Sequence, residues 1–505
     1  MIQLKLACLA IVFLTAGTPT MRAGGILTNT NQSIAFLRNP ARDGAIGIDG
    51  VYSNPAGVAF MNEGFHIAFN WQSVWQTRTI TTTNPLFALG VHNDAATSKT
   101  YKGRAEAPFL PSFQGAYNKG KWSFQFNAAV TGGGGKCEFK QGLGSFEGAV
   151  GQIANSLKPL GATGYDQNSY MQGKQFYFGF TLGAAYKVNE HLSVYGGLRA
   201  LYGIATYKAK ISDIRVNTAN GLIPFGTYLD QTNTYLAGNL AQVQAGLNQL
   251  KPIIDALGDN APEQYRTQYK TLLATQEQLT QARASLTQLE VYREGVNLQS
   301  DQTGFGIAPI IGVDYRTGNL NFAAKYEFRT RMSMKNKSTV NEVMAIEAVN
   351  QFRDGTSVRE DSPALLALGA QWSVLPNVRV NAGYHHFYDT DSKKYGDKQK
   401  LLAGGSNEYL GGAEWDPVEK FTVSGGFQIT RYGLTDNYMS DLSFVVNSWS
   451  FGLGAKYQVS DKVAVNAAYF QTNYGDYHTA SSTAGIQNSF TRTNKVLGLG
   501  VEVNF

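Results

Sequence analysis

Five basic residues are the sequence's best candidates for binding an anionic group: Arg38, Arg42, Arg199, Lys325 and Arg329. A cation held away from bulk water binds a carboxylate through charge-assisted hydrogen bonds, so these residues could hold an acidic head group. Arg199, Lys325 and Arg329 fall on the polar face of alternating stretches, and so do Glu327 and Glu414. Such charges more commonly pair with one another or face water, and the sequence leaves both interpretations open.

A second group that could do chemistry is His385-His386 with Asp389 and Asp391. Adjacent residues of a strand point to opposite faces, so the two histidines cannot easily share one ligand. The Asp-Thr-Asp run lacks the further oxygen ligands and the glycine of a calcium loop. No Ser/His/Asp spacing indicates a hydrolase. We therefore expect a solvated entry into a loop, with no catalytic residue, no metal and no cofactor, in a protein that is not an enzyme.

Composition favours many short strands over helices. The 505 residues include 55 Gly, 27 Tyr and 28 Phe but only 14 Pro, and 16% are charged. The net charge of +6 is too small to indicate a nucleic-acid partner. The length suits one large β-barrel.

Residues 1–23 are expected to be a secretory signal peptide, with Lys5 before an apolar run over 6–16 and cleavage after Ala23. Only Cys137 follows that leader, so no intramolecular disulfide is expected. The rest of the sequence has no run of 18 apolar residues, hence no predicted membrane helix. An exported chain without such helices can still cross a membrane as a closed barrel.

Fourteen stretches alternate apolar and polar residues, as half-buried strands do. They begin near residues 65, 110, 121, 171, 191, 303, 319, 362, 378, 404, 419, 446, 462 and 490. Tight turns such as Asn118-Lys119-Gly120 and Arg316-Thr317-Gly318 alternate with long polar loops. This rhythm predicts an all-β fold, a 14-stranded antiparallel transmembrane β-barrel of an outer membrane. A soluble β-sandwich would alternate too, but it would not explain the strict order of short and long connections.

Several aromatic residues near strand ends fit interfacial girdles, although ordinary β-propensity would also place them there. They are Trp122, Tyr186, Tyr202, Tyr315, Trp372, Trp415 and Tyr457. The chain ends on an aromatic residue, Phe505, in a strand that we expect the barrel-assembly machinery to recognise.

The stretch 32–61 is apolar but follows neither a helical nor a strand period. We interpret 24–63 as a plug, or hatch, that is folded inside a barrel formed by 64–505. A disordered leader is the alternative, but the stretch is too apolar for a solvated tail.

One long loop, 234–296, has a helical pattern instead. Leu236, Leu240, Val243, Leu247 and Leu250 follow the spacing of a heptad seam. A return helix repeats Tyr265, Leu272, Leu279 and Leu286 every seven residues, and Pro252 is expected to kink or end the first helix. We predict an antiparallel helical hairpin in an extracellular loop. It either packs on the barrel mouth or binds a partner.

The leader, the Asn54-Pro55-Ala56 triplet before the first strand, the fourteen strands and the terminal Phe505 together resemble the long-chain fatty-acid outer-membrane transporter family (FadL/TodX type). This resemblance implies a hatch inside the barrel, uptake of hydrophobic molecules, and sideways exit through a gap at a kinked third strand. The predicted third strand, 122–131, ends in four glycines that could permit such a bend, or simply begin a flexible loop. These lateral-gate candidates are Gly132, Gly133, Gly134 and Gly135.

The sequence therefore favours a passive transporter in the outer membrane of a Gram-negative bacterium. Its expected partners are outer-membrane lipid and hydrophobic small molecules such as long-chain fatty acids. The alternative function is a surface adhesion or assembly protein that uses the hairpin and keeps the barrel as an anchor. A general porin for polar solutes is a further alternative, against which the apolar plug argues.

Overall fold

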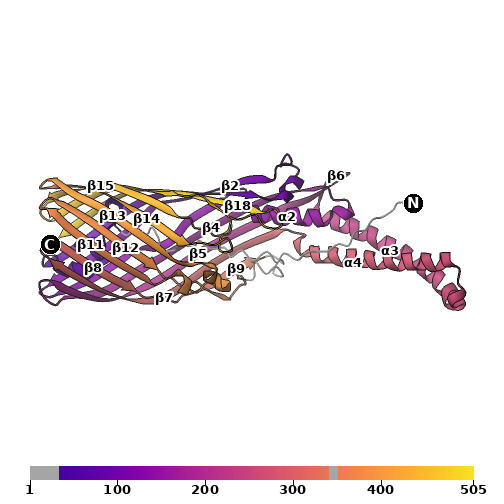
Figure 1. Ribbon diagram of the computed structural model, residues 1–505, viewed down its shortest axis with the longest axis horizontal. Coiled ribbons are helices and arrows are strands. Elements are labelled where there is room, and N and C mark those ends of the chain that lie inside the picture. Colours follow the sequence, from indigo (N-terminus) through magenta and orange to yellow (C-terminus); the bar gives the residue numbers. More distant parts are fainter. Residues whose placement is uncertain (1–32, 341–350) are drawn as a thin grey trace.

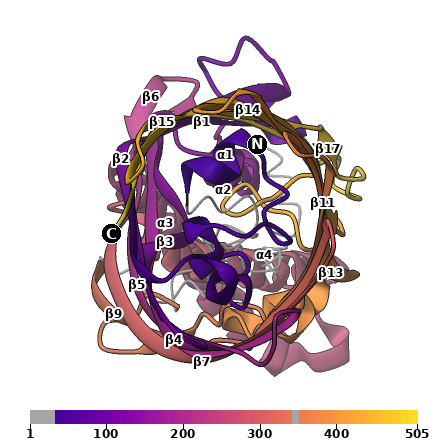
Figure 2. The ribbon, with the colours of Figure 1, turned by 90° about the vertical axis from the view of Figure 1, so that its left-hand side faces the viewer.

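The computed structural model describes residues 33–340 and 351–505, and its strands close into a barrel (Figures 1 and 2). The expected signal peptide lies outside the described residues. The sheet has 18 labelled segments. Four of them, β6, β9, β10 and β17, extend or continue a neighbouring strand. The barrel therefore has 14 antiparallel strands, as predicted. Pairing of β1 with β18, from His66–Asn504 to Thr83–Gln487, closes the ring.

The strands, in chain order, are β1 Gly64–Thr83, β2 Ser98–Lys119, β3 Trp122–Phe139, β4 Gly164–Lys187, β5 Leu192–Thr218, β6 Gly221–Pro224, β7 Val296–Thr317, β8 Leu320–Glu327, β9 Ser333–Val340, β10 Ser357–Arg359, β11 Leu365–Leu375, β12 Val378–Phe387, β13 Gly404–Val418, β14 Phe421–Gly433, β15 Ser448–Ser460, β16 Val463–Tyr474, β17 Tyr477–His478 and β18 Gln487–Asn504. Three of them, β2, β4 and β7, begin earlier than predicted. Their first residues are polar on the outward face, so the apolar alternation that marks the membrane band is absent there.

Alternation along each strand separates an apolar outward face from a small or polar inward face. In β18, Leu499 is 55% exposed and Val501 41% exposed, whereas Gly498 and Gly500 face the plug. Large apolar side chains exposed around a closed barrel are what a lipid environment requires. Near the tight turns, Trp122, Trp372 and Trp415 also point outward, as an aromatic girdle would.

The N-terminal segment fills the inside of the ring (Figure 2). It contains α1 Ile34–Arg38, capped by the Ser33 hydroxyl, and the short 3-10 helices η1 Ile48–Val51 and η2 Gly57–Phe60. It follows the wall: α1 lies against β15, β16 and β18, and η2 against β3, β4, β5 and β7. The described part of the predicted plug, from residue 33, thus lies in the lumen.

Glycines on β11 to β15 and on β18 let the plug approach the wall closely. A Cβ atom on any of them would overlap plug atoms between Ile34 and Gly44, or, at Gly500, would crowd Ile34. They are Gly369, Gly383, Gly412, Gly426, Gly452, Gly454, Gly498 and Gly500. This glycine belt explains why the inward face is so poor in side chains at the level of α1.

The long connections carry the helices. They are α2 Gly144–Ser156, α3 Phe225–Leu257 and α4 Glu263–Leu289, with the 3-10 helices η3 Pro85–Leu89, η4 Lys158–Leu160, η5 Gly258–Asn260, η6 Glu290–Tyr292, η8 Asp389–Asp391 and η9 Tyr395–Leu401. No helix among the described residues is both long and apolar enough to span a bilayer.

The helices α3 and α4 form the predicted hairpin at the end of the barrel away from the tight turns (Figure 1). Seam residues Leu236, Leu247 and Leu279 are buried. One expectation was wrong: the first helix begins at Phe225 rather than 234. Of the two alternatives for Pro252, the helix does not end there but continues to Leu257, which leaves the kink. The base packs on α2 and β5, as expected for packing on the mouth, but the remainder extends away from the barrel.

We predict that Gly452→Leu will detach α1 from the wall, because its side chain would occupy the place of the Leu37 carbonyl group. Hydrogen–deuterium exchange of peptides covering 33–45 should become faster, while heat-modifiable gel mobility shows that the barrel still folds. Gly196→Leu is the matched control, since its Cβ would meet open space. Equal protection of 33–45 in both variants would contradict the role of the glycine belt.

Candidate functional site

The half of the lumen beyond the plug contains a large apolar cluster. Inward side chains of the strands, such as Tyr177, Leu201 and Met334, form one buried cluster with the connection between β14 and β15. That connection contributes Tyr438, Met439, Phe444, Val445 and Val446. A barrel that conducts polar solutes has a polar, water-filled interior, so this lumen is suited to apolar ligands.

A pocket lies where the apolar lumen meets the plug. Its apolar lining is Phe36, Pro40, Leu365 and Phe387, and its polar lining is Arg42, Asp43, Tyr52, Ser53, Lys325, His385 and Glu408. An amphipathic molecule could place its tail on the first set and its head on the second. Two predicted head-group residues, Arg42 and Lys325, therefore belong to this pocket.

Arg38 and Arg42 bind acids of the protein itself. Arg42 Nε lies 2.7 Å from Asp49 Oδ2, and its Nη1 lies 3.2 Å from Glu414 Oε1. Arg38 Nη2 lies 3.4 Å from the same Glu414 oxygen, and Arg38 Nη1 donates to the Ser424 hydroxyl. All four charged groups are buried. These two arginines thus anchor the plug to the barrel, which favours internal pairing over ligand binding.

Arg199 is paired in the same way, with its Nη1 2.6 Å from Glu327 Oε1. The ring of Tyr52, from the plug, lies 4.9 Å from the Arg199 guanidinium carbon and 4.6 Å from Lys325 Nζ. Lys325 Nζ donates to the Tyr52 carbonyl at 2.6 Å and has no ion pair among the described residues. Of the five predicted cations, Lys325 is thus the best placed to bind an added anion.

Arg329 does not belong to this pocket. It donates to the Asp391 carbonyl and pairs with Asp361, near the loop that follows β12. Its role is to fix loops at the rim, which separates it from the other four predicted cations.

The interpretation of His385 as a solvated loop entry was wrong. His385 lies within β12 and points inward, with Nε2 3.0 Å from Asp43 of the plug and Nδ1 2.9 Å from Glu408 of β13. His386 points to the other face and contacts Asn407, as the alternation argument required. In the described part of the chain, no group of three or more His, Cys, Asp or Glu could hold a metal ion.

The Asn54-Pro55-Ala56 triplet ties the plug to three strands. Asn54 Nδ2 donates to Asp314 of β7 at 2.6 Å. The Pro55 carbonyl accepts from Gln125 of β3 at 2.7 Å, and the Ala56 carbonyl accepts from Ser193 of β5 at 2.7 Å. Each bond satisfies a polar group in the lumen. The triplet is therefore an anchoring point, and nothing in its geometry points to catalysis.

The third strand does not end at the four glycines, as the sequence pattern predicted, but continues to Phe139. Its pairing with β2 is interrupted: Glu106 pairs with Lys136 and Ser112 with Ala129, whereas the ladder is absent between 107–111 and 130–135. β3 also bulges against β4 at Gly132 and between Gly132 and Gly135. The glycines therefore lie beside an opening in the hydrogen-bonded wall rather than at a loop start.

Two prolines that the sequence analysis overlooked lie on the other side of this opening. Pro108 and Pro111 belong to the part of β2 that is not paired with β3, and proline has no N–H to donate to a ladder. Two prolines near the start of the predicted second strand, close to a glycine run at the end of the third, are the signal that could have indicated the interruption.

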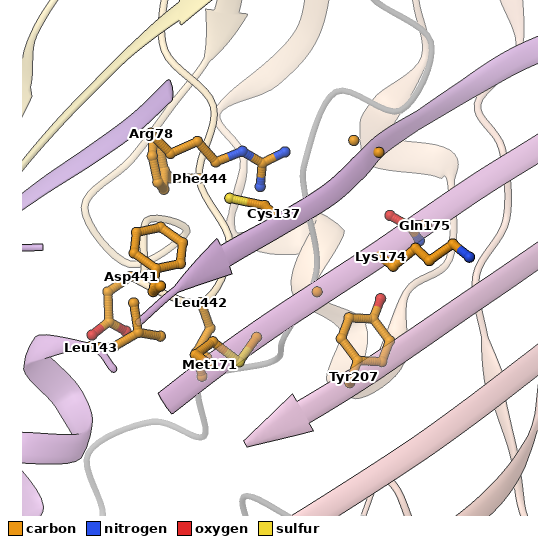
Figure 3. A pocket seen from close by; sticks show the side chains of 14 residues that line it. Arg78, Cys137, Leu143, Met171, Lys174, Gln175, Tyr207, Asp441, Leu442 and Phe444 are labelled. Atoms are coloured by element: carbon orange, nitrogen blue, oxygen red, sulfur yellow. The ribbon is translucent and has the colours of Figure 1, made fainter. Parts of the chain in front are cut away.

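A second pocket lies on the inner side of the opening (Figure 3). It is lined by Arg78, Gly134, Gly135, Cys137, Phe139, Leu143, Met171, Gly173, Lys174, Gln175, Tyr207, Asp441, Leu442 and Phe444. Lys174 and Gln175 are consecutive residues of β4 and point to opposite faces, yet both line it. The pocket thus lies at the wall, and four of its lining residues, Phe139, Leu143, Tyr207 and Phe444, belong to the apolar cluster of the lumen.

We expect Arg42→Gln to loosen the plug, because it leaves Asp49 and Glu414 without their shared cation, and breaking a buried pair costs roughly 3–5 kcal/mol. Maleimide labelling of the buried plug position Ala41→Cys, in a Cys137→Ser background, should become faster by about two orders of magnitude or more. The control Arg329→Gln removes a partly exposed arginine at the rim and should leave labelling unchanged. Slow labelling in both would show that the Arg42 network does not hold the plug.

No family model matches the chain, and no curated protein matches it. Among solved structures, the chain resembles a FadL homologue of Pseudomonas aeruginosa with a TM-score of 0.60 and 12% identity, over 95% of this chain and 100% of the other. It also resembles the toluene transporter TodX of Pseudomonas putida, with a TM-score of 0.51 and 12% identity, over 91% and 94% of the two chains. At this identity the likeness is one of fold.

Proposed function

We propose that this chain, which has the fold of the FadL-type outer-membrane barrels, lets hydrophobic compounds such as long-chain fatty acids cross the outer membrane passively. The observation that carries the proposal is an apolar lumen that is closed on one side by the plug and borders an opening between β2 and β3. Such a lumen provides a path for a molecule that leaves sideways into the membrane.

The proposed location is the outer membrane of a Gram-negative bacterium. It is supported by the exposed apolar band and the outward tryptophans near the turns. The expected leader, 1–23, would direct export, and the barrel-assembly machinery would recognise β18 and the terminal Phe505. Outer-membrane lipid would then contact the outward face.

The proposed route begins at the mouth, where the ligand enters the apolar cluster around Tyr207 and Phe444. Each buried methylene contributes about 0.8 kcal/mol, so a long alkyl chain gains enough to leave water. The ligand then reaches the pockets at Lys325 and at Gly134, beside the plug and the wall. Exit follows between β2 and β3, where fewer backbone hydrogen bonds must be broken.

This arrangement disfavours a general porin. A polar solute would lose its hydration shell among apolar side chains that offer few hydrogen bonds, which costs roughly 2–7 kcal/mol per unpaired polar group. The plug also fills the lumen at the level of the glycine belt.

The proposal is tested by deleting Gly133. Gly132 pairs with Tyr177 and Gly135 pairs with Gln175, so β3 has one residue more than β4 between these two pairs. The deletion makes the two numbers equal and so removes one bulge. We expect the barrel to fold and the uptake of a radiolabelled long-chain fatty acid to fall. Because the structurally similar TodX is a toluene transporter, uptake of toluene is measured in parallel. The turn variant Gly120→Ala, with open space at its Cβ, is the control.

Wild-type uptake of both compounds by the Gly133 deletion would remove the wall opening from the route. Wild-type protein that transports neither compound would overturn the proposed function itself.

The hairpin is the observation that favours the alternative, a surface adhesion or assembly protein, because it extends beyond the barrel. Replacing 238–277 by a short Gly-Ser linker keeps the buried base residues Leu236 and Leu279. We expect this variant to retain fatty-acid uptake. If cells that carry this variant still adhere to surfaces, the result would further oppose the alternative function. If they lose adhesion but keep normal uptake, the result would support an additional role of the hairpin in adhesion.

A further inference from the structure

A group of basic side chains lies on the outer surface of the barrel, on the mouth side of the opening between β2 and β3. Its members, called the basic patch below, are Lys102 and Arg104 of β2, Lys136 of β3, Lys140 directly after β3, Lys174 of β4, and Lys208 and Lys210 of β5. All are exposed or half-buried. Ala105, Cys137 and Tyr207 belong to the buried cluster of the lumen, so the side chains next to them along each strand point outward.

The basic patch begins where the apolar outward band ends. No outward residue between 176 and 186 of β4, or between 194 and 204 of β5, carries a charge. A strand needs about 9–11 residues to cross the hydrocarbon core of a bilayer, so these two segments suffice to span it. The charged outward residues that follow, Lys174 on β4 and Lys208 and Lys210 on β5, are therefore at the level of the lipid head groups.

Acidic side chains do not balance the patch. The outward acids beside it are Glu106 of β2, Glu138 of β3 and Asp301 of β7. Lys136 Nζ lies 3.9 Å from Glu138, and within residues 33–340 and 351–505 no other member of the patch has an ion pair. Lys136 is also in register with Lys174, and like charges directly opposite each other on one face of a sheet repel. The patch thus carries positive charge that invites an external anion.

The charge is confined to one side of the barrel. In register with Arg104, the outward residues are Thr77 on β1, Thr493 on β18 and Asn473 on β16, all of them neutral. The Thr77 and Thr493 hydroxyl groups are hydrogen-bonded to each other at 2.6 Å. Lysines that only held the barrel at its depth in the membrane would be needed all around the ring. A patch on β2 to β5 alone indicates a local partner.

The patch also lines a hollow between two strands. The ladder of β2 with β3 runs only from Arg104–Glu138 to Glu106–Lys136 at this end, so the strands part on the mouth side of it. The pocket there is lined by Thr100, Tyr101, Lys102, Arg104, Glu106, Lys136, Glu138, Phe139, Lys140, Gln141 and Gly142. On the other side of the same short ladder lies the opening in the wall. A group bound in the hollow would meet cations from both strands.

We propose that the basic patch binds the phosphorylated head group of a lipid of the outer leaflet, whose acyl chains lie along the apolar band beside the opening. Phosphate oxygens accept charge-assisted hydrogen bonds from lysine and arginine, and clusters of these residues next to a membrane attract anionic lipids. The patch adjoins the apolar band, so a partner that joins phosphates to alkyl chains satisfies both surfaces. The site depends on the proposed membrane location and goes beyond the proposed transport.

The test measures, by native mass spectrometry, how purified and delipidated full-length protein binds diphosphoryl lipid A and monophosphoryl lipid A, which differ by one phosphate. Wild-type protein should bind the diphosphoryl form about fivefold more tightly or better. The variant Lys102→Gln, Arg104→Gln, Lys136→Gln, Lys174→Gln should bind it roughly 100-fold more weakly, since each basic residue near an anionic lipid surface contributes about fivefold. The variant Lys102→Arg, Lys136→Arg, Lys174→Arg keeps the charge and should bind as wild type does.

The matched control removes the same number of charges at the tight turns, where no member of the patch lies. It is Lys119→Gln, Lys121→Gln, Lys420→Gln, Lys462→Gln, and all four of these lysines are exposed. It should bind diphosphoryl lipid A as wild type does.

Four results would overturn the site: equal binding of the two lipids by wild-type protein, undiminished binding by the glutamine variant of the patch, an equal loss in the turn control, or complete displacement of the lipid by millimolar inorganic phosphate, which would indicate a simple anion site. The comparison of the two lipids on wild-type protein decides even where the glutamine variant does not fold, as judged by heat-modifiable mobility. Failure of wild-type protein to transport any hydrophobic compound would overturn the proposed function and leave this site standing.

Discussion

Satisfying an irregular backbone at membrane depth is the constraint on which the rest of this structure depends. The plug has little regular structure, so its carbonyl groups need partners from the wall. Inward side chains provide them: Asn321 donates to the Gly44 carbonyl, Gln125 to that of Pro55, and Asn118 to that of Val58. Such backbone is tolerated at this depth only where protein or water surrounds it. The polar lining of the barrel at the level of the plug is therefore a consequence of the plug.

This constraint divides the lumen into two zones. At the level of the plug the wall presents amides, ion pairs and the glycine belt, which together hold a segment of defined shape. Beyond it the same strands present Tyr177, Leu201 and Met334, and inward-folded loops complete an apolar cluster. The pocket that contains Lys325 and His385 lies at the boundary of the zones. A ligand that displaces polar contacts there competes with the bonds that keep the plug in place.

The opening in the wall depends on residues that weaken a ladder on both of its strands. Pro108 and Pro111 remove donors from β2, while Gly133 and Gly135 adopt left-handed backbone conformations that other residues rarely accept. Closure of the barrel elsewhere is continuous along β1 and β18. The weak point is thus local, and the strands that border it remain anchored at both ends by regular pairing.

The sequence by itself determined the strand number, the inward and outward faces, the place of the plug and the hairpin seam. Each depends on a local period or on order along the chain, as the Leu236 to Leu250 spacing illustrates. Only the tertiary structure decided which charges meet. His385 binds Asp43, 342 residues away, and Arg78 opposes Arg492, because closing a barrel joins the first strand to the last. Alternation tells which face a side chain occupies, but strand register decides its neighbours, and a long-range register leaves no local period in the sequence.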